Sequence, residues 1–377
     1  MTDQKHLQAL VEETDEKIAA LLKERFSLRE QIMKEKMLLG ESFYDGNREK
    51  NRIEKLTQDT DDDFSRHGLE EVFAHLGAID RKQRYRLLTM SGSSGKLPFI
   101  QVDTLMDSEN IRVVYQGTEG AYSHAALWKY FGEDVNSFHV RRFRDAMEAI
   151  AEGAADYAVL PIENSTAGIV GDNFDLLVDF ENYIVGDVMI PCEHVLMGLP
   201  GASIDQISAV YSHQQALLQC EEYLEQHPGW SLVPYDNTAL AARKIAEEGD
   251  ITHAAIGSEF AAARYGLKIL ADHIYSDESN ATRFLIVTNQ RIFLPDAGRI
   301  SICFELPHYS GSLYNILSHI IYNDLNMVKI ESRPIQGKSW EYRFFIDFEG
   351  NLNEPSVRNA LRGIRSEAIN MKILGNY

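Results

Sequence analysis

Residues 4–39 carry apolar side chains at the spacing of one helical face. The stripe consists of Leu7, Leu10, Val11, Thr14, Ile18, Leu21, Leu22, Leu28, Ile32 and Met33. Steps of three and four residues predict a single helix, which at 1.5 Å per residue is more than about 50 Å long. Because the segment offers no partner of that length, we expect the stripe to be buried against the same helix of a second chain. Shorter helices at 45–57 and 64–89 complete an all-helical region, residues 1–90.

Residues 111–290 alternate strands with helices. They follow a linker, residues 91–110, which opens with the flexible stretch SGSSGKLP. Runs such as IRVVYQG, AADYAVLPIEN and ISAVYSH each predict a strand that ends in a polar loop. This alternation predicts an α/β domain whose polar loops gather at the carboxyl ends of the strands. The segment is long enough for two lobes with a cleft between them.

Residues 299–377 show a third pattern. The runs RISICFEL, MVKIESRPI, WEYRFFIDFEG and MKILGNY predict strands, and SGSLYNILSHIIYNDL and EPSVRNALRGIRSEA predict helices. In chain order this gives βαββαβ, the ferredoxin-like arrangement of an α+β domain. The whole chain is therefore expected to be multidomain, with an all-α, an α/β and an α+β part.

The charge balance narrows the range of partners. There are 57 acidic and 37 basic residues, a net charge of −20 at pH 7. Such a charge argues against nucleic acid and anionic membranes as partners. An anionic substrate would need specific Arg or Lys side chains, or helix N-termini, to bind against this field.

The chain lacks the usual targeting and cofactor signals. The opening MTDQKHLQAL is not a secretory signal, and no apolar run reaches the roughly 18 residues that a membrane span needs. The odd, scattered cysteines Cys192, Cys220 and Cys303 suit reduced thiols in the cytoplasm. No CxxC, HExxH or P-loop pattern is present, so we expect neither a metal nor another cofactor.

Four short stretches of the α/β segment combine polar side chains with tight turns. They are GTEGAYSH at 117–124, PIENSTAG at 161–168, YSHQQALLQC at 211–220 and NATRF at 280–284. In the last, Thr282 and Arg283 stand ahead of the buried strand FLIV, where a ligand or a carboxylate must satisfy the guanidinium. Each stretch alone fits a turn or a helix cap. Because all four lie where the ends of predicted strands converge, a binding or reaction site is favoured.

Together these motifs resemble prephenate dehydratase. The similarity rests on PIEN with its small polar pair, the GxxGxYSH loop, the YSH…QC stretch and the TRF triplet. Residues 299–377 resemble the ACT regulatory domain, with GSLY at 311–314 and ESRP at 331–334. Residues 1–90 are similar to the all-helical chorismate mutase that is fused to this enzyme in a bifunctional family. The resemblance covers essentially the whole chain.

The resemblance implies a reaction and its residues. Prephenate would lose CO2 and water to give phenylpyruvate, a task for general-acid catalysis and positioning. Thr282 would lie beside the leaving hydroxyl, with Asn164 near it. Glu163 would supply or orient a proton, or instead pair with Arg283. The substrate-binding residues would be Ser123, Ser165, Thr166, Ser212, Gln215, Gln219 and Arg283.

The helical region departs from the family at three positions. The resemblance implies that chorismate is bound by Arg25, Lys36, Asp45, Arg48, Glu49 and Arg84. Yet Gln8 replaces the arginine expected from the partner helix, Asp80 replaces a serine, and Arg84 replaces a glutamine. Asp80 would repel a substrate carboxylate unless Arg84 or Arg81 neutralised it. The alternative is a helical dimerisation arm that keeps ancestral charges.

The third segment is expected to bind L-phenylalanine as a feedback inhibitor. The resemblance assigns this site to Gly311, Ser312, Leu313, Glu331, Ser332, Arg333 and Pro334. The alternative is a simple dimerisation domain, because ferredoxin-like folds serve many functions.

Three functions therefore compete. The first is a cytoplasmic prephenate dehydratase of phenylalanine biosynthesis with a mutase domain, acting as a homodimer or a dimer of dimers. The second is arogenate dehydratase, which keeps the mechanism and changes one substituent of the substrate. The third is a two-lobed amino-acid sensor without catalysis.

Overall fold

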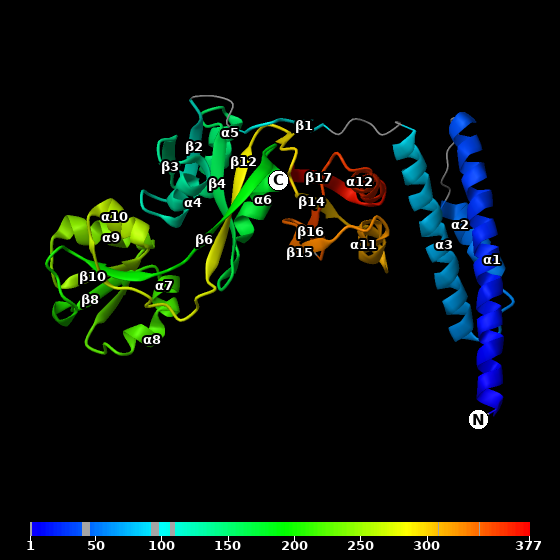
Figure 1. The fold of residues 1–377 in the computed structure, drawn as a ribbon, viewed down its shortest axis with the longest axis horizontal. Coiled ribbons are helices and arrows are strands. Elements are labelled where there is room, and N and C mark those ends of the chain that lie inside the picture. Colours follow the sequence, from blue (N-terminus) through cyan, green and yellow to red (C-terminus); the bar gives the residue numbers. More distant parts are fainter. Residues whose placement is uncertain (1, 40–45, 92–97, 106–109, 308, 339) are drawn as a thin grey trace. The chain divides into compact units, whose positions relative to one another are not determined.

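The computed structural model, whose elements are labelled in Figure 1, divides into two compact units. Unit 1 comprises residues 1–97, 304–328 and 352–371, and unit 2 comprises residues 98–303, 329–351 and 372–377. The structure describes residues 2–39, 46–91, 98–105, 110–307, 309–338 and 340–377. The side chains of residues 2, 3, 46–50 and 89 lie outside this description.

Unit 1 is built of helices, as the apolar spacing of residues 1–90 predicts. Its elements are α1 (Thr2–Leu39), α2 (Gly46–Thr57), α3 (Asp63–Met90), α11 (Ser312–Tyr322) and α12 (Pro355–Glu367). Helix α3 begins where the Asp62 carboxylate accepts the N–H groups of Phe64 and Ser65, at 3.0 and 3.2 Å. Helix α3 packs against both α12 and α11, and its Tyr85 ring meets the ring of His319 on α11 edge-on at 5.8 Å.

The larger sheet of unit 2 carries the first lobe. Its strands run in the order β15-β16-β14-β17-β6-β12-β4-β2-β3, with β5 beside β4. The bounds are β2 (Arg112–Gln116), β3 (Asn136–Val140), β4 (Tyr157–Asn164), β5 (Gly168–Ile169), β6 (Tyr183–Pro191), β12 (Ala281–Thr288), β14 (Arg299–Glu305), β15 (Met327–Pro334), β16 (Tyr342–Glu349) and β17 (Ile369–Asn376). Its helices are α4 (Tyr122–Phe131), α5 (Phe143–Ala151) and α6 (Gly171–Asp179).

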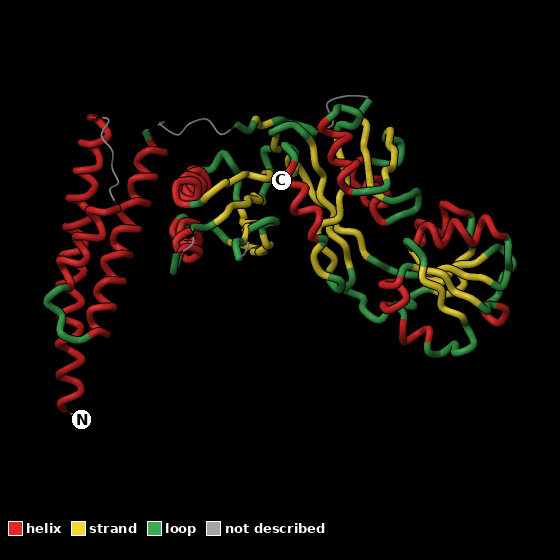
Figure 2. The backbone as a smooth tube through the Cα atoms, turned by 180° about the vertical axis from the view of Figure 1, so that it is seen from behind, coloured by secondary structure: helices red, strands yellow, loops and turns green. Residues whose placement is uncertain are grey.

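Residues 192–280 form the second lobe (Figure 2). A separate sheet has the order β11-β7-β10-β8-β9. Its strands are β7 (Val195–Gly198), β8 (Ala209–Ser212), β9 (Ser231–Pro234), β10 (His253–Gly257) and β11 (Lys268–Ala271). The surrounding helices are the 3₁₀ turn η1 (Ile204–Gln206), α7 (Gln214–Gln219), α8 (Glu221–Leu224), α9 (Thr238–Glu248) and α10 (Glu259–Tyr265).

Strand β12 is buried on both faces, as FLIV predicts. Phe284 and Ile286 belong to one apolar cluster, and Leu285 and Val287 belong to the cluster on the opposite face. The strand lies between β4 and β6 and is antiparallel to both. Because strands β6 and β12 also connect the two lobes, their ends form the junction between the lobes.

Other segments refine the expected organisation. Within the expected linker, β1 (Ile100–Gln101) pairs in parallel with β13 (Ile292–Phe293). From residue 299 on, the elements follow the order β14, α11, β15, β16, α12, β17. A Cβ added to Gly375 would lie 2.0 Å from the Ile184 carbonyl oxygen, so only glycine allows β17 to approach β6 this closely. Among the described residues, no helix has the length and apolar content that crossing a membrane requires.

Candidate active site

Thr282 and Asn164 lie opposite each other at the junction of the lobes. Thr282 is at the start of β12 and Asn164 at the end of β4, and the strand register pairs the two residues directly. At the same place the chain enters the second lobe after Pro191 and returns at Ala281, where the Cys192 N–H donates to the Asn280 carbonyl at 2.8 Å. The sequence motifs PIEN and TRF therefore meet at one point, as expected.

The Asn164 side chain is held in one orientation. Its Oδ1 accepts the backbone N–H groups of Thr166 (3.1 Å) and Ala167 (2.7 Å). Its Nδ2 therefore faces the other way, where it donates to Thr282 Oγ1 at 2.9 Å and to Asn280 Oδ1 at 2.8 Å. Because Thr282 Oγ1 receives a hydrogen bond from Asn164, its own hydrogen can be donated.

Further polar side chains continue from this pair into the second lobe. Thr166 Oγ1 donates to Asn164 Oδ1 at 2.8 Å and accepts from Gln219 Nε2 at 2.8 Å. His194 Nε2 lies 2.9 Å from Gln219 Oε1, and its Nδ1 lies 3.0 Å from the Tyr122 hydroxyl. Thr166, Asn164 and Gln219 are thus brought together with Thr282.

Other predicted substrate ligands have partners in the chain itself. The Ser123 hydroxyl donates to the Gln116 carbonyl at 2.5 Å, and the fully buried Ser212 hydroxyl donates to Ile256 O at 2.7 Å. Ser165 Oγ donates to Ser279 O and accepts the Ala281 N–H. Gln215 lies in the first turn of α7, where its N–H donates to His213 Nδ1. Their role as substrate ligands stays a prediction.

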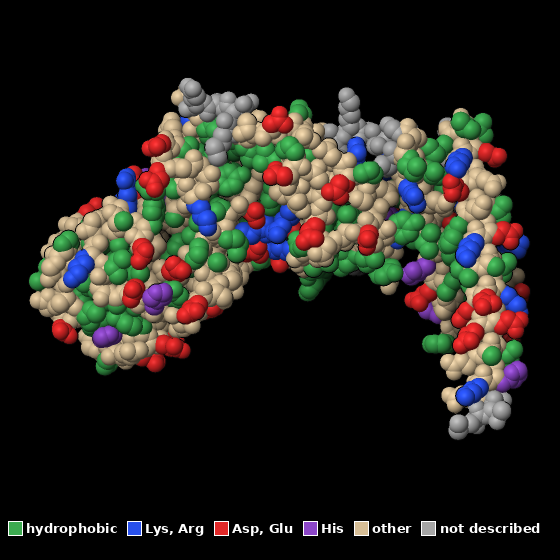
Figure 3. Space-filling model, in the orientation of Figure 1, with side chains coloured by type: hydrophobic (Ala, Val, Ile, Leu, Met, Phe, Trp, Pro, Cys, Tyr) green, Lys and Arg blue, Asp and Glu red, His purple; other side chains and the backbone are tan. Residues whose placement is uncertain are grey.

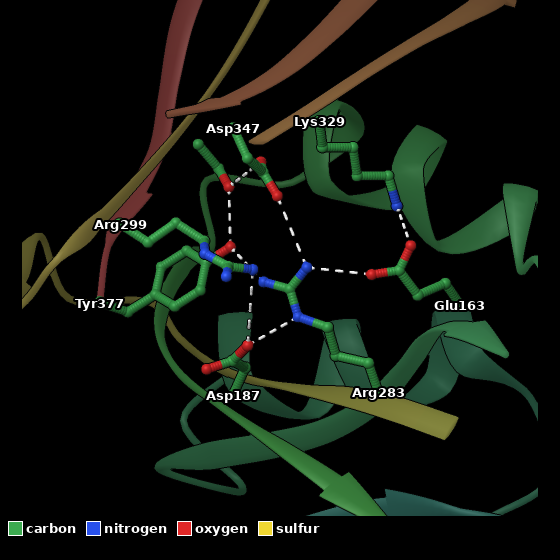
Figure 4. Close-up of polar contacts among 8 residues, drawn as sticks. Glu163, Asp187, Arg283, Arg299, Lys329, Asp347 and Tyr377 are labelled. Carbon is green, nitrogen blue, oxygen red and sulfur yellow. Dashed lines mark hydrogen bonds and ion pairs between the residues drawn. The ribbon is translucent and has the colours of Figure 1, made fainter. Parts of the chain in front are cut away.

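Arg283 points towards a cluster of charged side chains that contains Glu163 and Asp187 (Figure 4). Successive side chains of a strand lie on opposite faces, so Arg283 and Thr282 diverge, and Arg283 is 6% exposed. Its Nη1 contacts Glu163 Oε1 at 3.0 Å, and its Nε contacts Asp187 Oδ2 at 2.6 Å. Its Nη2 donates to the Tyr377 hydroxyl at 2.9 Å. These are the contacts of the structural alternative, so the expectation that Thr282 and Arg283 face one substrate together is corrected.

Charges are balanced around Arg283. Lys329 Nζ pairs with Glu163 Oε2. Asp347 Oδ2 lies 3.6 Å from Arg283 Nη1. Asp187 Oδ2 lies 4.0 Å from Arg299 Nη1. Three cations thus face three carboxylates. Burial raises the pKa of Glu163, but the hydrogen bonds from Lys329 and Arg283 outweigh it and hold the pKa below its usual value. The two cations thus favour the ionised form of Glu163, and its role in supplying or orienting a proton stays a prediction.

In the helical region, Asp80, which stands where the family has a serine, binds Arg25, the arginine that was expected to bind chorismate. Arg25 on α1 donates from Nη1 and Nη2 to the two oxygens of Asp80 on α3, at 2.9 and 2.7 Å. Arg29 Nε adds a third contact at 3.0 Å. Asp80 is 7% exposed, so the carboxylate is well buried. The neutralising arginines are therefore Arg25 and Arg29, whereas Arg81 pairs with Glu367.

The remaining predicted residues are placed as follows. Lys36 lies on α1 beyond Arg25, and Arg84 lies on α3, half-buried beside the Tyr85 ring. Asp45 and the side chains of Arg48 and Glu49 lie outside the described residues. The residues assigned to phenylalanine are divided between the units: Gly311, Ser312 and Leu313 belong to unit 1, and Glu331, Ser332, Arg333 and Pro334 to unit 2.

Sequence reasoning missed three members of the site. Cys192 Sγ lies 3.2 Å from Thr282 Oγ1, and Asn280 and His194 are the partners given above. All three are buried. The motif PCEH directly after a strand, and the asparagine directly before TRF, were signals that could have revealed them. Among the described residues, no group of His, Cys, Asp and Glu is arranged to hold a metal ion.

The chain is similar to known proteins in both its α/β and its helical region. A family model described as prephenate dehydratase matches residues 113–292, and one described as chorismate mutase type II matches residues 7–81. A bifunctional chorismate mutase/prephenate dehydratase from Pseudomonas aeruginosa is 31% identical over 100% of this chain and 99% of its own length. Arogenate dehydratase 4 from Arabidopsis thaliana is 36% identical, over 82% of this chain and 78% of its own length.

A solved structure agrees with these matches. The crystal structure of a prephenate dehydratase from Arthrobacter aurescens, in complex with L-Phe, has a TM-score of 0.66 and 30% sequence identity. It covers 71% of this chain and 89% of the other. Fold and sequence thus define a dehydratase region joined to a mutase region. The chain belongs to the family of bifunctional chorismate mutase/prephenate dehydratases.

Proposed function

We propose that the chain converts prephenate into phenylpyruvate in phenylalanine biosynthesis. The electron pair of the bond to the ring carboxylate moves into the ring and expels the C4 hydroxyl, so decarboxylation and dehydration support each other. One proton is taken up overall, because the hydroxyl leaves as water and CO2 departs. The observation that carries the proposal is the fixed Asn164 amide, which donates to Thr282 Oγ1 and leaves the Thr282 hydrogen available for donation.

A hydrogen bond donated by Thr282 would assist the departure of the C4 hydroxyl. A positioned donor at a leaving group contributes about 10²–10⁴-fold to a rate. Among the described residues, no side chain caps α4, whose N-cap is Ala121. Its N–H groups can therefore take a substrate carboxylate, as expected for the GTEGAYSH loop. Ionised Glu163 has a different part, because it holds Arg283 on the far face of the same strand pair.

The test is a product assay on the full chain with prephenate and, in parallel, arogenate. Phenylpyruvate formed from prephenate supports the proposal, and no product from either substrate removes it. Faster formation of phenylalanine from arogenate would establish the second candidate, which the similarity to arogenate dehydratase 4 favours. That outcome keeps the mechanism and changes the recognition of one amino or keto group.

We infer chorismate mutase activity for the helical region, residues 1–90. A pericyclic rearrangement needs cations that clamp two carboxylates and a donor at the ether oxygen. Arg25 and Arg29 on α1 supply positive charge, although Asp80 competes for both. Conversion of chorismate by the full chain tests this inference separately from the dehydratase assay.

We also propose that residues 299–377 form a ferredoxin-like ACT domain that binds L-phenylalanine, and that residues 111–290 form the two-lobed dehydratase of periplasmic-binding-protein type. The βαββαβ order and the complex of a similar protein with L-Phe support the first point. Strand β15 carries Lys329 and Arg333, which pair with Glu163 on β4 and Asp175 on α6. Effector binding at ESRP would thus act on the strand that ends in Asn164.

Regulation has its own test. Lys329→Met should keep phenylalanine binding, measured by calorimetry, while weakening inhibition of phenylpyruvate formation about tenfold, a typical allosteric coupling. Lys338→Met removes the same charge from the adjoining hairpin, where Lys338 pairs with exposed Glu341, and should leave inhibition unchanged. Equal inhibition of wild type and Lys329→Met would contradict this route.

We propose a homodimer or a dimer of dimers in the cytoplasm. Apolar side chains of α1 remain exposed in the single chain, for example Leu7 (57%), Leu21 (65%) and Leu28 (52%). A second copy of α1 would cover them, as the helical stripe predicts. Light scattering should show a lower mass for Leu21→Glu than for the wild type.

Acidic side chains are spread over the visible surface (Figure 3), which agrees with a net charge of −20 and with small-molecule rather than nucleic-acid partners.

A further inference from the structure

An unbroken series of hydrogen bonds leads from Tyr122 to Thr282. The contacts are Tyr122 to His194 (3.0 Å), His194 to Gln219 (2.9 Å), Gln219 to Thr166 (2.8 Å), Thr166 to Asn164 (2.8 Å) and Asn164 to Thr282 (2.9 Å). We call this series the donor chain. It crosses between the lobes twice, because His194 and Gln219 belong to the second lobe. Its geometry is therefore complete only when the lobes are in this mutual arrangement.

The links share one direction when the Thr166 hydroxyl uses its shorter contact, to Asn164 Oδ1 at 2.8 Å, rather than its longer one, to Asn280 Oδ1 at 3.2 Å. Gln219 donates through Nε2 to Thr166, so its Oε1 faces His194 and must accept. His194 Nε2 therefore carries the hydrogen. A neutral imidazole carries one hydrogen, which leaves Nδ1 to accept from the Tyr122 hydroxyl. Burial lowers the pKa of His194 against the opposing effect of Gln219, and burial raises the pKa of Tyr122, so both groups have the protonation that this direction needs.

We propose that Tyr122 and His194 are positioning residues of the dehydratase, which act through Gln219, Thr166 and Asn164 to direct the Thr282 hydrogen at the leaving hydroxyl. All links donate towards Thr282, and hydrogen bonds aligned in this way polarise one another. No proton has to travel along the donor chain, because its effect is to orient and strengthen the final donor. Cys192 Sγ lies 3.2 Å from Thr282 Oγ1 and is a second partner of that hydroxyl, in a contact where either atom can be the donor.

The proposal rests on the proposed dehydratase function and is tested on the full chain with prephenate. Tyr122→Phe removes the first donor and should lower kcat about tenfold, the size of one hydrogen bond. KM should change less than twofold. The matched control is Tyr265→Phe, because the Tyr265 hydroxyl also joins the lobes, by donating to the Glu119 carbonyl at 2.7 Å, but lies outside the donor chain. Its kcat should stay within about twofold of the wild type.

Two histidine variants separate the links. His194→Gln places an amide near the Nε2 position and can still donate to Gln219, so it should keep more of kcat than His194→Asn, whose shorter amide mimics Nδ1. A purely structural histidine would show no such order. Thermal unfolding of each variant checks that the fold is retained, and should His194→Asn not fold, Tyr122→Phe decides the question.

A double-mutant cycle gives the sharpest outcome. In the Thr282→Ala background, Tyr122→Phe should have no further effect on the residual rate, because the chain then has no end to act on. Full multiplication of the two effects would overturn the proposal, and so would an unchanged kcat in Tyr122→Phe. Failure of the wild type to form phenylpyruvate would instead refute the proposed function itself.

Discussion

The mutase and dehydratase regions each contain an arginine that binds carboxylates of the chain, but the consequences for the site differ. Arg25 in the helical region and Arg283 in the α/β region were both assigned to substrate anions, and both bind carboxylates of the chain. In the dehydratase, Arg283 stabilises one face of a strand while the neutral pair Asn164 and Thr282 occupies the other. The mutase has no such separation, because Asp80 binds the guanidinium that should clamp the substrate. Structural and chemical roles are divided in one region and compete in the other.

The largest effect expected from this comparison concerns Thr282. Thr282→Ala should lower kcat for prephenate about 100-fold or more, because it removes the donor at the leaving hydroxyl. KM should change little, since the substrate carboxylates are bound elsewhere. Thr282→Ser keeps the hydroxyl and should retain most activity. Steady-state kinetics of the three proteins check the assignment, and an unaffected kcat in Thr282→Ala would remove Thr282 from the mechanism.

Arg283 should behave in the opposite way, as a matter of stability. Arg283→Met leaves Glu163, Asp187 and Asp347 without their shared cation, and breaking a buried ion pair costs about 3–5 kcal/mol. The control is Arg291→Met, whose exposed pair with Glu181 contributes at most about 1 kcal/mol. Thermal or denaturant unfolding measures both. A Arg283→Met protein as stable as Arg291→Met would show that Arg283 has another partner, such as the substrate.

Much of the fold could be predicted because its signals are local. The helical stripe of residues 4–39 and the βαββαβ order from residue 299 on both depend on neighbours a few residues apart. The union of PIEN with TRF also followed, since strand mouths of one sheet lie together. The expectation that Thr282 and Arg283 face one substrate overlooked their spacing. The two residues are consecutive in a strand, and consecutive side chains of a strand point to opposite faces. Their observed faces in β12 follow from that rule.

Other parts of the site could not be inferred from local sequence. Asp187, Asp347 and Tyr377 lie on β6, β16 and beyond β17, and they reach Arg283 only through the strand order of the larger sheet. His194 and Tyr122 meet only because two lobes are packed against each other. For Asp80, the sequence raised the need for a neutralising arginine and named Arg84 or Arg81, whereas the packing of α1 on α3 selects Arg25 and Arg29.

A smaller gain is expected from restoring the mutase pattern. Asp80→Ser should raise kcat/KM for chorismate about tenfold, because it frees Arg25 and Arg29 for a substrate carboxylate, a charge-assisted interaction of that size. Asp63→Ser is the control, since Asp63 is an exposed acid of the same helix paired with Arg66. Chorismate consumption is measured for both variants. Should Asp80→Ser lower the rate instead, Asp80 would be a required support of Arg25 and not its competitor.

The smallest effect is a pH dependence that separates Glu163 from catalysis. The pKa of Glu163 is held below its usual value of 4.5, because the hydrogen bonds from Lys329 and Arg283 outweigh the opposing effect of burial. A depressed pKa adds stability above the unfolded value, and that stability is lost as the pH falls through the folded value. The wild type should therefore be more stable than Glu163→Gln at pH 7, with the difference shrinking below about pH 4.5. An acid role for Glu163 would instead make kcat fall as the carboxyl ionises, so an alkaline loss of kcat in this range that Glu163→Gln abolishes would return Glu163 to the chemistry.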